Sequence, residues 1–493
     1  MAKRLKEQGK TALTPEDVEA CLRVLGSIVA DRGALADVDR ETRKTLLIAA
    51  GKVSRPERAE QRRLAKELRR REKAGVRAAD QVLLDGTGIR ELRRAPVFET
   101  PSAARELPAG QSEAERVLRE ARKCYVCKAE FTQLHAFYDQ MCPPCAELNW
   151  RKRHQTADLR GRTALVTGAR VKIGYQAAIK LLRAGARVIV TTRFAHDAAE
   201  RYAREGDFEQ WRDRLEVFGL DLRHTPSVEA FAKHLCEREA RLDFVLHNAC
   251  QTVRRPPGYY AHLMDREQAP TSALPAAARA LVAGHEQLTH TQPAGRRAAE
   301  LSQAKLTPED HMLTGRVDLF PAGALDQDLQ QIDLRTHNSW RLTLAEVPTV
   351  ELLEVVLVNA VAPFVLSARL KPLMLRERTG DKQIVNVSAM EGQFYREHKT
   401  DKHPHTNMAK AALNMLTRTS SADYARDGIY MNSVDTGWVT DEDPAHLAVR
   451  KQDEHGFHPP LDIVDGAARI CDPVFTRSTE HGLFYKDYRQ IPW

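Results

Sequence analysis

The fold of this chain is decided by one stretch, Thr163-Ala-Leu-Val-Thr167-Gly168-Ala-Arg170-Val-Lys172-Ile173-Gly174-Tyr-Gln-Ala-Ala-Ile-Lys-Leu-Leu182. Its apolar beginning predicts a short strand, its two glycines predict a tight turn, and the apolar residues that follow recur at helical spacing. At such a turn, backbone N–H groups and the helix dipole both face a bound anion. The stretch therefore predicts a dinucleotide-binding unit, with an ordinary βα unit of an α/β protein as the alternative.

Length and composition indicate a globular chain of several domains. Its 493 residues are 42% hydrophobic and 29% charged, and the formal net charge is +8. The sequence shows no run of about 18 apolar residues and no apolar signal core near its N-terminus. We therefore expect no transmembrane helix, no membrane partner and a cytoplasmic location.

Residues 1–120 form a basic region that we expect to be helical. Thr14 is the expected N-cap of a first helix, and further helices are predicted at residues 40–50 and 56–74. The last of these is rich in arginine and lysine, which suits either a nucleic-acid-binding arm or a solvated helix held by ion pairs. Its interleaved glutamates favour the solvated helix, so nucleic acid is not the expected partner.

Residues 121–155 contain two Cys-x-x-Cys pairs and predict a separate metal module. Zinc prefers four soft ligands in a tetrahedron, and each pair supplies two thiolates from one turn. With the helix predicted after the second pair, the pattern resembles a treble-clef zinc finger, so we expect one structural zinc ion bound by Cys124, Cys127, Cys142 and Cys145. The alternatives are a redox pair and a site in which His135 replaces one cysteine. Loss of zinc should unfold this module and leave the rest of the chain folded.

From residue 158 to residue 493, further motifs follow the glycine turn in the order of a known family. Predicted strands lead to Asp221-Leu222, to Asn248-Ala249-Cys250 and to Ser388. Together with the turn, they resemble the short-chain dehydrogenase/reductase family, although Lys172 stands where that family has its middle glycine. The resemblance implies an α/β fold with a doubly wound parallel Rossmann sheet, preceded here by the helical region and the small zinc-binding module.

The resemblance also implies a cofactor site, and Arg193 indicates which cofactor it takes. Arg193 ends the second predicted strand, where an acid would bind the ribose 2′-hydroxyl of NAD and a base the 2′-phosphate of NADP. We therefore expect NADP, with NAD as the second candidate and a merely exposed arginine as the alternative. The residues that match the family's cofactor positions are Thr167, Gly168, Arg170, Lys172, Ile173, Gly174, Arg193, Asp221, Leu222, Asn248, Ala249, Lys410 and Thr440.

Residues 251–344 interrupt the family pattern with an insertion far longer than the loops usual in compact domains. The insertion is polar and proline-punctuated, and its best candidate helix covers residues 273–288. Because the corresponding point of the family borders the active site, the insertion could form a lid or a partner surface. A surface excursion without a function is the alternative.

The catalytic set implied by the resemblance is incomplete. In the family a tyrosine donates a proton to the substrate oxygen, and a lysine, a serine and an asparagine assist it. Lys410, Ser388 and Asn359 match the assisting residues, but Thr406 stands at the position of the tyrosine. An aliphatic hydroxyl is a far weaker acid than a phenol. The neighbouring His405 or His403 could donate the proton instead, and Tyr395 is a third candidate.

These motifs lead to three hypotheses of function. The first is an atypical NADP-dependent oxidoreductase that acts on a carbonyl or alcohol, with a small-molecule substrate and a homo-oligomeric state. The second is a catalytically impaired nucleotide-binding regulator or scaffold that binds a protein partner through its zinc module. The third is a nucleic-acid-associated protein that uses the basic helix.

Overall fold

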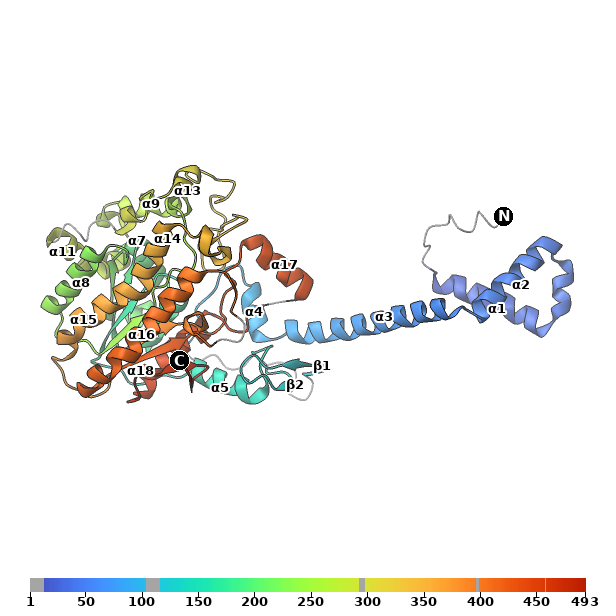
Figure 1. The fold of residues 1–493 in the computed structure, drawn as a ribbon, viewed down its shortest axis with the longest axis horizontal. Coiled ribbons are helices and arrows are strands. Elements are labelled where there is room, and N and C mark those ends of the chain that lie inside the picture. The colour runs from blue at the N-terminus through green and yellow to red at the C-terminus, as the bar shows by residue number, and fades with distance from the viewer. Residues whose placement is uncertain (1–12, 103–115, 292–297, 396–398, 457) are drawn as a thin grey trace. The chain divides into compact units, whose positions relative to one another are not determined.

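The glycine turn follows β3, the sixth strand across an eight-stranded sheet with the strand order β10-β9-β8-β7-β6-β3-β4-β5. This computed structural model describes residues 13–102, 116–291, 298–395, 399–456 and 458–493 (Figure 1). Strands β3 to β9 run parallel, whereas β10 is antiparallel to β9. The strands are β3 (Thr163–Thr167), β4 (Arg187–Thr192), β5 (Leu215–Gly219), β6 (Phe244–His247), β7 (Lys382–Ser388), β8 (Ile429–Asp435), β9 (Phe484–Lys486) and β10 (Arg489–Ile491).

Helices cover both faces of this sheet. Every residue of β3 and β6 is buried, as expected for central strands of a parallel sheet. One face carries α6 (Lys172–Arg183), α7 (Ala195–Ala203) and α18 (Ile463–Thr476), and the other carries α8 (Thr225–Arg238), α15 (Ala362–Met374) and α16 (Pro404–Arg426). Because β3 lies between β4 and β6, the chain reverses its direction across the sheet here. The doubly wound Rossmann fold is therefore confirmed, with its binding crevice expected at this reversal.

One helical stretch, Thr349–Met374, is long and apolar enough to cross a membrane. It joins α14 (Thr349–Val356), a π-helical turn (Leu357–Val361) and α15, and its most apolar window has a mean hydropathy of 1.9. This finding corrects the expectation that no such stretch exists. Leu366, Leu370 and Leu373 are nevertheless fully buried in the core beneath α15, so the stretch is placed as a core helix of the α/β domain.

The insertion forms a set of short helices between β6 and α14. They are α9 (Ala261–Gln268), α10 (Ala276–Leu281), α11 (Ala283–Thr291), α12 (Ala298–Leu301) and α13 (Pro308–Met312). The single helix predicted at residues 273–288 is thus two helices that are separated at Val282. Within the insertion, the guanidinium of Arg254 pairs with Asp310 at 2.6 Å and with Glu354 of α14 at 2.9 Å. These buried ion pairs fasten the insertion to the α/β domain.

The chain divides into two compact units, Met1–Ala79 and Asp80–Trp493. In the first unit, the predicted helices are α1 (Pro15–Ala30), α2 (Arg40–Ser54) and the beginning of α3 (Arg58–Asp85). Thr14 caps α1 as expected, since its hydroxyl accepts the N–H of Asp17 and the Asp17 carboxylate accepts the N–H of Thr14. Helices α1 and α2 bury no residue.

The division between the units lies closer to the N-terminus than the boundary predicted at residue 120. The Asp80 carboxylate accepts the backbone N–H groups of Arg119 and Glu120, so residues around 80 pack with the following module. Leu84 of α3 and Ile89 of α4 (Gly88–Arg94) are buried in the core of that module. Helix α3 was predicted to end near residue 74 but continues to Asp85 because its last turns contribute to this core.

Candidate functional site

The glycine turn requires both of its glycines. Gly168 has a φ of +67°, and a Cβ atom there would lie 2.7 Å from the Cα of Ala249. A Cβ atom on Gly174 would lie 2.3 Å from the Nδ2 of Asn248. That amide is fixed, because it donates hydrogen bonds to the carbonyl oxygens of Thr167 at 3.0 Å and Gly168 at 3.1 Å. The end of β6 therefore closes against the turn, and side chains larger than hydrogen do not fit.

We expect Gly174→Ala to destabilise the protein and to weaken nucleotide binding. The added methyl group must displace either the Asn248 amide or the turn, and overpacking of this kind costs about 1–3 kcal/mol. Thermal unfolding and calorimetric titration with NADPH measure the two effects. Gly206→Ala is the matched control, since a Cβ atom there meets nothing within 4 Å. Unchanged stability and affinity in Gly174→Ala would contradict the steric role of this glycine.

Lys172, which stands at the position of the family's middle glycine, has a backbone conformation that favours glycine. Its φ is +56°, a left-handed backbone that costs a non-glycine residue roughly 1 kcal/mol. The side chain lies near Asp328 of the insertion: burial raises the pKa of Asp328, and the Lys172 charge partly offsets this. Arg201 of α7 binds the same insertion turn by donating to the carbonyl oxygens of Asp328 and Leu329. The insertion residues Asp328 and Leu329 thus lie near the glycine turn.

Arg193 follows the end of β4 and has an environment unlike that of Arg170. The buried Arg170 guanidinium forms an ion pair with Asp197 at 2.7 Å, so its charge is neutralised within the protein. Arg193 is half-buried and forms no ion pair within the described part of the chain. Its Nη2 donates to the hydroxyl of Tyr260 at 2.6 Å. Of these two arginines, Arg193 is the one that is available to an anion.

The remaining predicted cofactor residues already have contacts within the protein. The Asp221 carboxylate is bound by Arg223 at 2.6 Å, and Leu222 is buried in the core on the α8 face. Ala249 donates its backbone N–H to the Thr167 hydroxyl at 3.0 Å, which ties β6 to the turn. The Thr440 hydroxyl donates to Glu442 at 2.8 Å.

Ser388 and Lys410 lie side by side at the end of β7. The Lys410 ammonium donates to the carbonyl oxygen of Val387, directly before Ser388, at 2.8 Å. The Ser388 hydroxyl donates to the Oδ1 of Asn414 at 2.6 Å. Lys410 and Asn414 are four residues apart on α16 and share one helical face. Helix α16 therefore brings together the lysine and the serine that the sequence predicted.

Asn359 lies in the π-helical turn between α14 and α15. Its Nδ2 donates to the carbonyl oxygens of Val355 at 2.8 Å and Gln251 at 3.1 Å. The π-helical turn is a local departure from regular helix of the kind that is frequent at functional sites. Asn359 thus ties the beginning of the insertion to the helix that packs against α16.

Several polar atoms around Thr406 are buried without a hydrogen-bond partner among the described residues. They are Oγ1 of Thr406, Nδ1 and Nε2 of His405, Oε1 of Glu351 and Oδ1 of Asn359. Thr406 and His405 are each 1% exposed, and the Nε2 of His405 lies 3.4 Å from the Oε1 of Glu351. Buried polar groups are rarely left unpaired in native proteins, and such groups concentrate at sites that bind water or ligand. The structure therefore marks this region as a candidate site.

The two other proposed proton donors are placed differently. Tyr395 is 96% exposed, so its phenol points away from the buried site. His403 has a φ of +43° and its ring stacks on Trp340 at a centroid distance of 3.8 Å. Of these two histidines, His405 is the one whose ring lies close to a carboxylate of α14, that of Glu351.

Sequence reasoning missed Glu351, Asn414 and Tyr260. Asn414 could have been found, because it continues the helical face of Lys410 at a spacing of four residues. Glu351 and Tyr260 are far in sequence from the residues that they contact and match no motif. Only the packing of α14 and of the insertion reveals them.

The four predicted cysteines meet in the metal module of the second unit. Cys124 and Cys127 lie between β1 (Val117–Lys123) and β2 (Glu130–Gln133), and Cys142 and Cys145 lie at the start of α5 (Pro143–Arg153). All four Sγ atoms lie within 4.8 Å of one another. A tetrahedral zinc site with Zn–S bonds of about 2.3 Å has S–S edges of roughly 3.8 Å, so the cluster fits zinc with a small contraction.

His135 does not belong to this cluster. Its Nδ1 accepts the backbone N–H groups of Phe137 at 3.0 Å and Tyr138 at 3.3 Å. Burial lowers the pKa of His135 to about 4, so the ring is neutral. Among the thiols, the backbone N–H of Ala129 lowers the pKa of Cys127 to about 7, whereas burial raises the pKa of Cys142 and of Cys145. Metal binding would therefore have to displace the protons of these two thiols.

The metal module shares its core with the α/β domain. Phe137, Tyr138 and Met141 are buried together with Val439, Leu461 and Val464 from the segments around α18. Ile173 of the glycine turn packs against the same cluster. The module that the sequence predicted to fold alone is therefore in direct contact with the proposed cofactor turn.

Buried ion pairs cross the same interface. Arg153 of α5 binds Asp462, the N-cap of α18, at 2.6 Å and Asp465 at 2.9 Å, and all three side chains are buried. The Tyr138 hydroxyl also donates to Asp465 at 2.6 Å. Removing one partner of a buried pair leaves an uncompensated charge. The orientation of α18 thus depends on the metal module.

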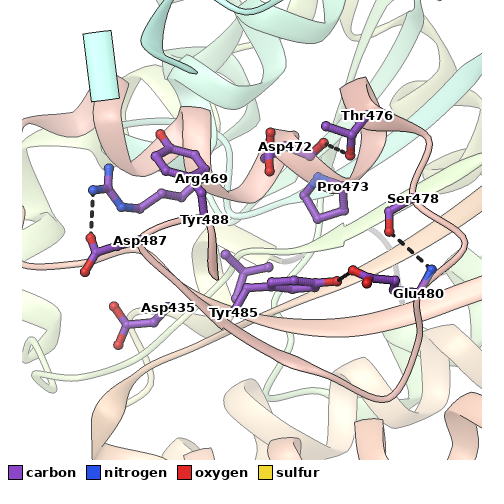
Figure 2. A pocket seen from close by; sticks show the side chains of 11 residues that line it. Asp435, Arg469, Asp472, Pro473, Thr476, Ser478, Glu480, Tyr485, Asp487 and Tyr488 are labelled. Atoms are coloured by element: carbon purple, nitrogen blue, oxygen red, sulfur yellow. Dashed lines mark hydrogen bonds and ion pairs between the residues drawn. The ribbon is translucent and has the colours of Figure 1, made fainter. Parts of the chain in front are cut away.

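A cavity of about 340 Å³ lies behind β8 and β9, next to α18 (Figure 2). Its lining includes Arg469, which binds Asp487 at 2.9 Å, and Tyr485, which donates to Glu480. None of the residues predicted for cofactor or catalysis lines it. Asp435, which lines the cavity, is paired with Ser388 across β7 and β8, so the cavity borders the strand end that carries this serine.

Comparison with known proteins gives the following matches. Residues 162–272 match the family model described as short chain dehydrogenase, and residues 323–456 match the model described as Enoyl-(Acyl carrier protein) reductase. The chain is 30% identical to Uncharacterized protein R665 of Acanthamoeba polyphaga mimivirus over 75% of this chain and 74% of that protein. It is 39% identical to Dehydrogenase/reductase SDR family member 13 of Bos taurus over 23% of this chain, a segment that spans only 29% of the bovine protein.

Comparison with solved structures also gave matches. The RhlG/NADP active-site complex of Pseudomonas aeruginosa is 18% identical, with a TM-score of 0.40 over 63% of this chain and 90% of that one. A short chain dehydrogenase from Burkholderia cenocepacia in complex with NADP is 18% identical, with a TM-score of 0.41 over 66% of this chain and 96% of that one.

Proposed function

The chain belongs to the short-chain dehydrogenase/reductase family, and from this premise we propose that it is an NADP-dependent oxidoreductase acting on a carbonyl or alcohol. The observation that carries the proposal is a buried group of polar atoms, at Thr406, His405 and Asn359, that have no hydrogen-bond partner among the described residues. Thr406 shares a face of α16 with Lys410, four residues further on, whereas His405 lies against Glu351 of α14. A site with this composition is suited to hold a polar substrate and to move a proton.

The described residues suit two groups of NADP, its pyrophosphate and its 2′-phosphate. The glycine turn leaves room for a close backbone approach at Gly168 and Gly174, and the α6 N-terminus follows directly. Arg193 offers to the 2′-phosphate a guanidinium that forms no ion pair with any carboxylate of the described residues. When bound, NADPH would supply the hydride that reduces the substrate carbon. Lys410 and Ser388 would orient the ribose and the substrate oxygen.

We assign the proton to His405 rather than to Thr406. The Thr406 hydroxyl is too weak an acid to donate unaided, although it can accept or orient a hydrogen bond. An imidazolium is a far stronger acid than an aliphatic alcohol, and it becomes a neutral imidazole when it donates its proton. The proton would pass from His405 to the substrate oxygen as the hydride reaches the carbon, so the alcohol product is neutral.

We also propose that Cys124, Cys127, Cys142 and Cys145 hold one structural zinc ion. Four thiolates leave no open coordination position, so this ion would not take part in catalysis. A protein partner of the metal module, a homo-oligomeric state and a cytoplasmic location stay predictions. Binding of nucleic acid is not part of the proposal.

Arg193→Asp should abolish the preference for NADPH over NADH. A charge-assisted contact to the 2′-phosphate is lost, and the new carboxylate repels that phosphate while it can accept the 2′-hydroxyl of NADH. We expect NADPH affinity to fall roughly a hundredfold, which corresponds to about 2.7 kcal/mol. Calorimetric titration of both cofactors measures this effect. Arg204→Asp on the exposed end of α7 is the matched control, and equal affinities of wild-type protein for the two cofactors would contradict the assignment.

The oxidoreductase proposal itself is tested by following NADPH consumption by the purified full chain on a panel of aldehydes and ketones. We expect at least one substrate class to be reduced, and Lys410→Ala to remove the activity. NADPH binding without reduction of any carbonyl would favour the regulator hypothesis instead. Absence of both binding and reduction would contradict the proposed function altogether.

A further inference from the structure

Tyr260 is an insertion residue that lies on the proposed cofactor arginine. It ends a short 3₁₀ turn (Pro257–Tyr260) and is buried in an aromatic cluster with Phe194, Tyr259 and Phe320. Its ring lies 5.0 Å from that of Phe194, the residue that directly follows Arg193. The insertion is therefore anchored at the end of β4, where the family resemblance places the 2′-position of the adenosine ribose.

The contact between Arg193 and Tyr260 has two parts. The guanidinium carbon lies 4.5 Å from the centre of the Tyr260 ring, and the Nη2 donates to the hydroxyl at 2.6 Å. The ring therefore fixes the plane of the guanidinium, while the hydroxyl uses only one of its donors. The other N–H groups of Arg193 stay available to a ligand.

Charge balance around this contact leaves room for one anion. Arg170 is paired with Asp197, and Arg255 is paired with Asp333. Arg193 has no carboxylate partner in the part of the chain that the structure describes. The Arg193 charge contributes to lowering the pKa of Asp221, but that carboxylate is bound by Arg223. A half-buried guanidinium without an ion-pair partner of its own suits a site that is completed by an anionic ligand.

The Tyr260 hydroxyl can serve the same anion. In the hydrogen bond with Arg193 it acts as the acceptor, so its own proton is free to be donated. Burial alone would raise the pKa of Tyr260, but the charges of Arg193 and Arg255 outweigh it and lower that pKa below its ordinary value. A more acidic phenol is a stronger hydrogen-bond donor to an oxyanion.

We propose that Tyr260 is a specificity residue of the cofactor site, whose hydroxyl donates a hydrogen bond to the 2′-phosphate that Arg193 binds. The insertion then supplies one half of the phosphate site and the Rossmann core the other. This inference rests on the proposed NADP preference, and it gives the insertion a function in cofactor selection.

Tyr260→Phe tests the inference, because it removes the hydroxyl and keeps the ring that stacks on Arg193. The probes are adenosine 2′,5′-bisphosphate and adenosine 5′-monophosphate, titrated into the full chain by calorimetry. We expect the affinity for the bisphosphate to fall roughly ten- to hundredfold, as for a lost hydrogen bond to a charged group. The affinity for the monophosphate should not change. Tyr259→Phe is the matched control and should alter neither affinity.

Unchanged bisphosphate affinity in Tyr260→Phe would overturn the inference. A tighter affinity would also overturn it, because Tyr260 would then occupy the phosphate position instead of completing it. If the wild-type chain reduces no carbonyl but the bisphosphate affinity still falls in Tyr260→Phe, the inference stands and only the oxidoreductase proposal fails. Equal wild-type affinities for the two probes would overturn the inference together with the NADP preference.

Discussion

Cys142→Ser should destabilise the whole Asp80–Trp493 unit and not the metal module alone. The structural reason is the shared core, in which Phe137 and Tyr138 of the module pack against Leu461 and Val464. If the module loosens, Asp462 and Asp465 also lose Arg153, and breaking a buried ion pair costs about 3–5 kcal/mol. This expectation replaces the one from the sequence, in which the rest of the chain stays folded.

Thermal unfolding of the purified chain, with and without a zinc chelator, measures the effect. We expect chelation of wild-type protein and the Cys142→Ser change to lower the main transition by a similar amount, and metal analysis should give about one zinc per chain only in the untreated wild type. Cys21→Ser is the matched control, since that thiol is exposed and lies outside the cluster. A main transition at the wild-type temperature in Cys142→Ser would contradict the coupling.

Hydrogen exchange can locate the same coupling without any nucleotide or substrate. Because Ile173 packs against the module's core, amides at the start of α6 and of α18 should exchange faster once zinc is removed. Amides of α8 lie on the opposite face of the sheet and should change less. Equal acceleration across all helices would indicate general unfolding instead of a local connection.

Lys410→Ala should reduce turnover by roughly a hundredfold to ten-thousandfold, and His405→Ala should have an effect of similar size. Lys410 is a buried cation that donates to the carbonyl oxygen directly before Ser388, and its removal deletes the charge that we propose orients the cofactor ribose and the substrate. His405 is the proposed proton donor next to Glu351. Thr406→Val should change turnover only modestly, since valine keeps the shape of threonine and removes a hydroxyl that is too weak an acid.

Steady-state rates with NADPH and the best carbonyl of the panel measure these effects, together with NADPH affinity in each variant. Lys402→Ala is the matched control, because that lysine precedes α16 in sequence and is not buried. Cofactor binding should persist in His405→Ala, which separates proton transfer from binding. Loss of activity in Thr406→Val with intact NADPH binding would show that threonine acts directly and that the assignment to His405 is wrong.

The sequence alone determined those features that depend on residues close together along the chain. The strands of the sheet were recognisable as short runs between turns, because their residues are buried on both faces. The glycine turn could be predicted from the spacing of Gly168 and Gly174, since it obeys local backbone geometry. The four cysteines could be predicted for the same reason, because a single turn determines the spacing within each pair. Lys410 and Ser388 were predicted from their match to a family pattern.

Only the tertiary structure decided which of the predicted groups are free and which are already used. The sequence predicted Arg193 as the cofactor arginine and offered Arg170 as a second cation. Only the structure shows that Asp197 neutralises Arg170, whereas Tyr260 leaves the charge of Arg193 available. Likewise, spacing defined the metal module but could not show that Arg153 reaches α18. These contacts join segments separated by tens to hundreds of residues, so their partners are selected by packing in three dimensions. No local pattern along the chain records that selection.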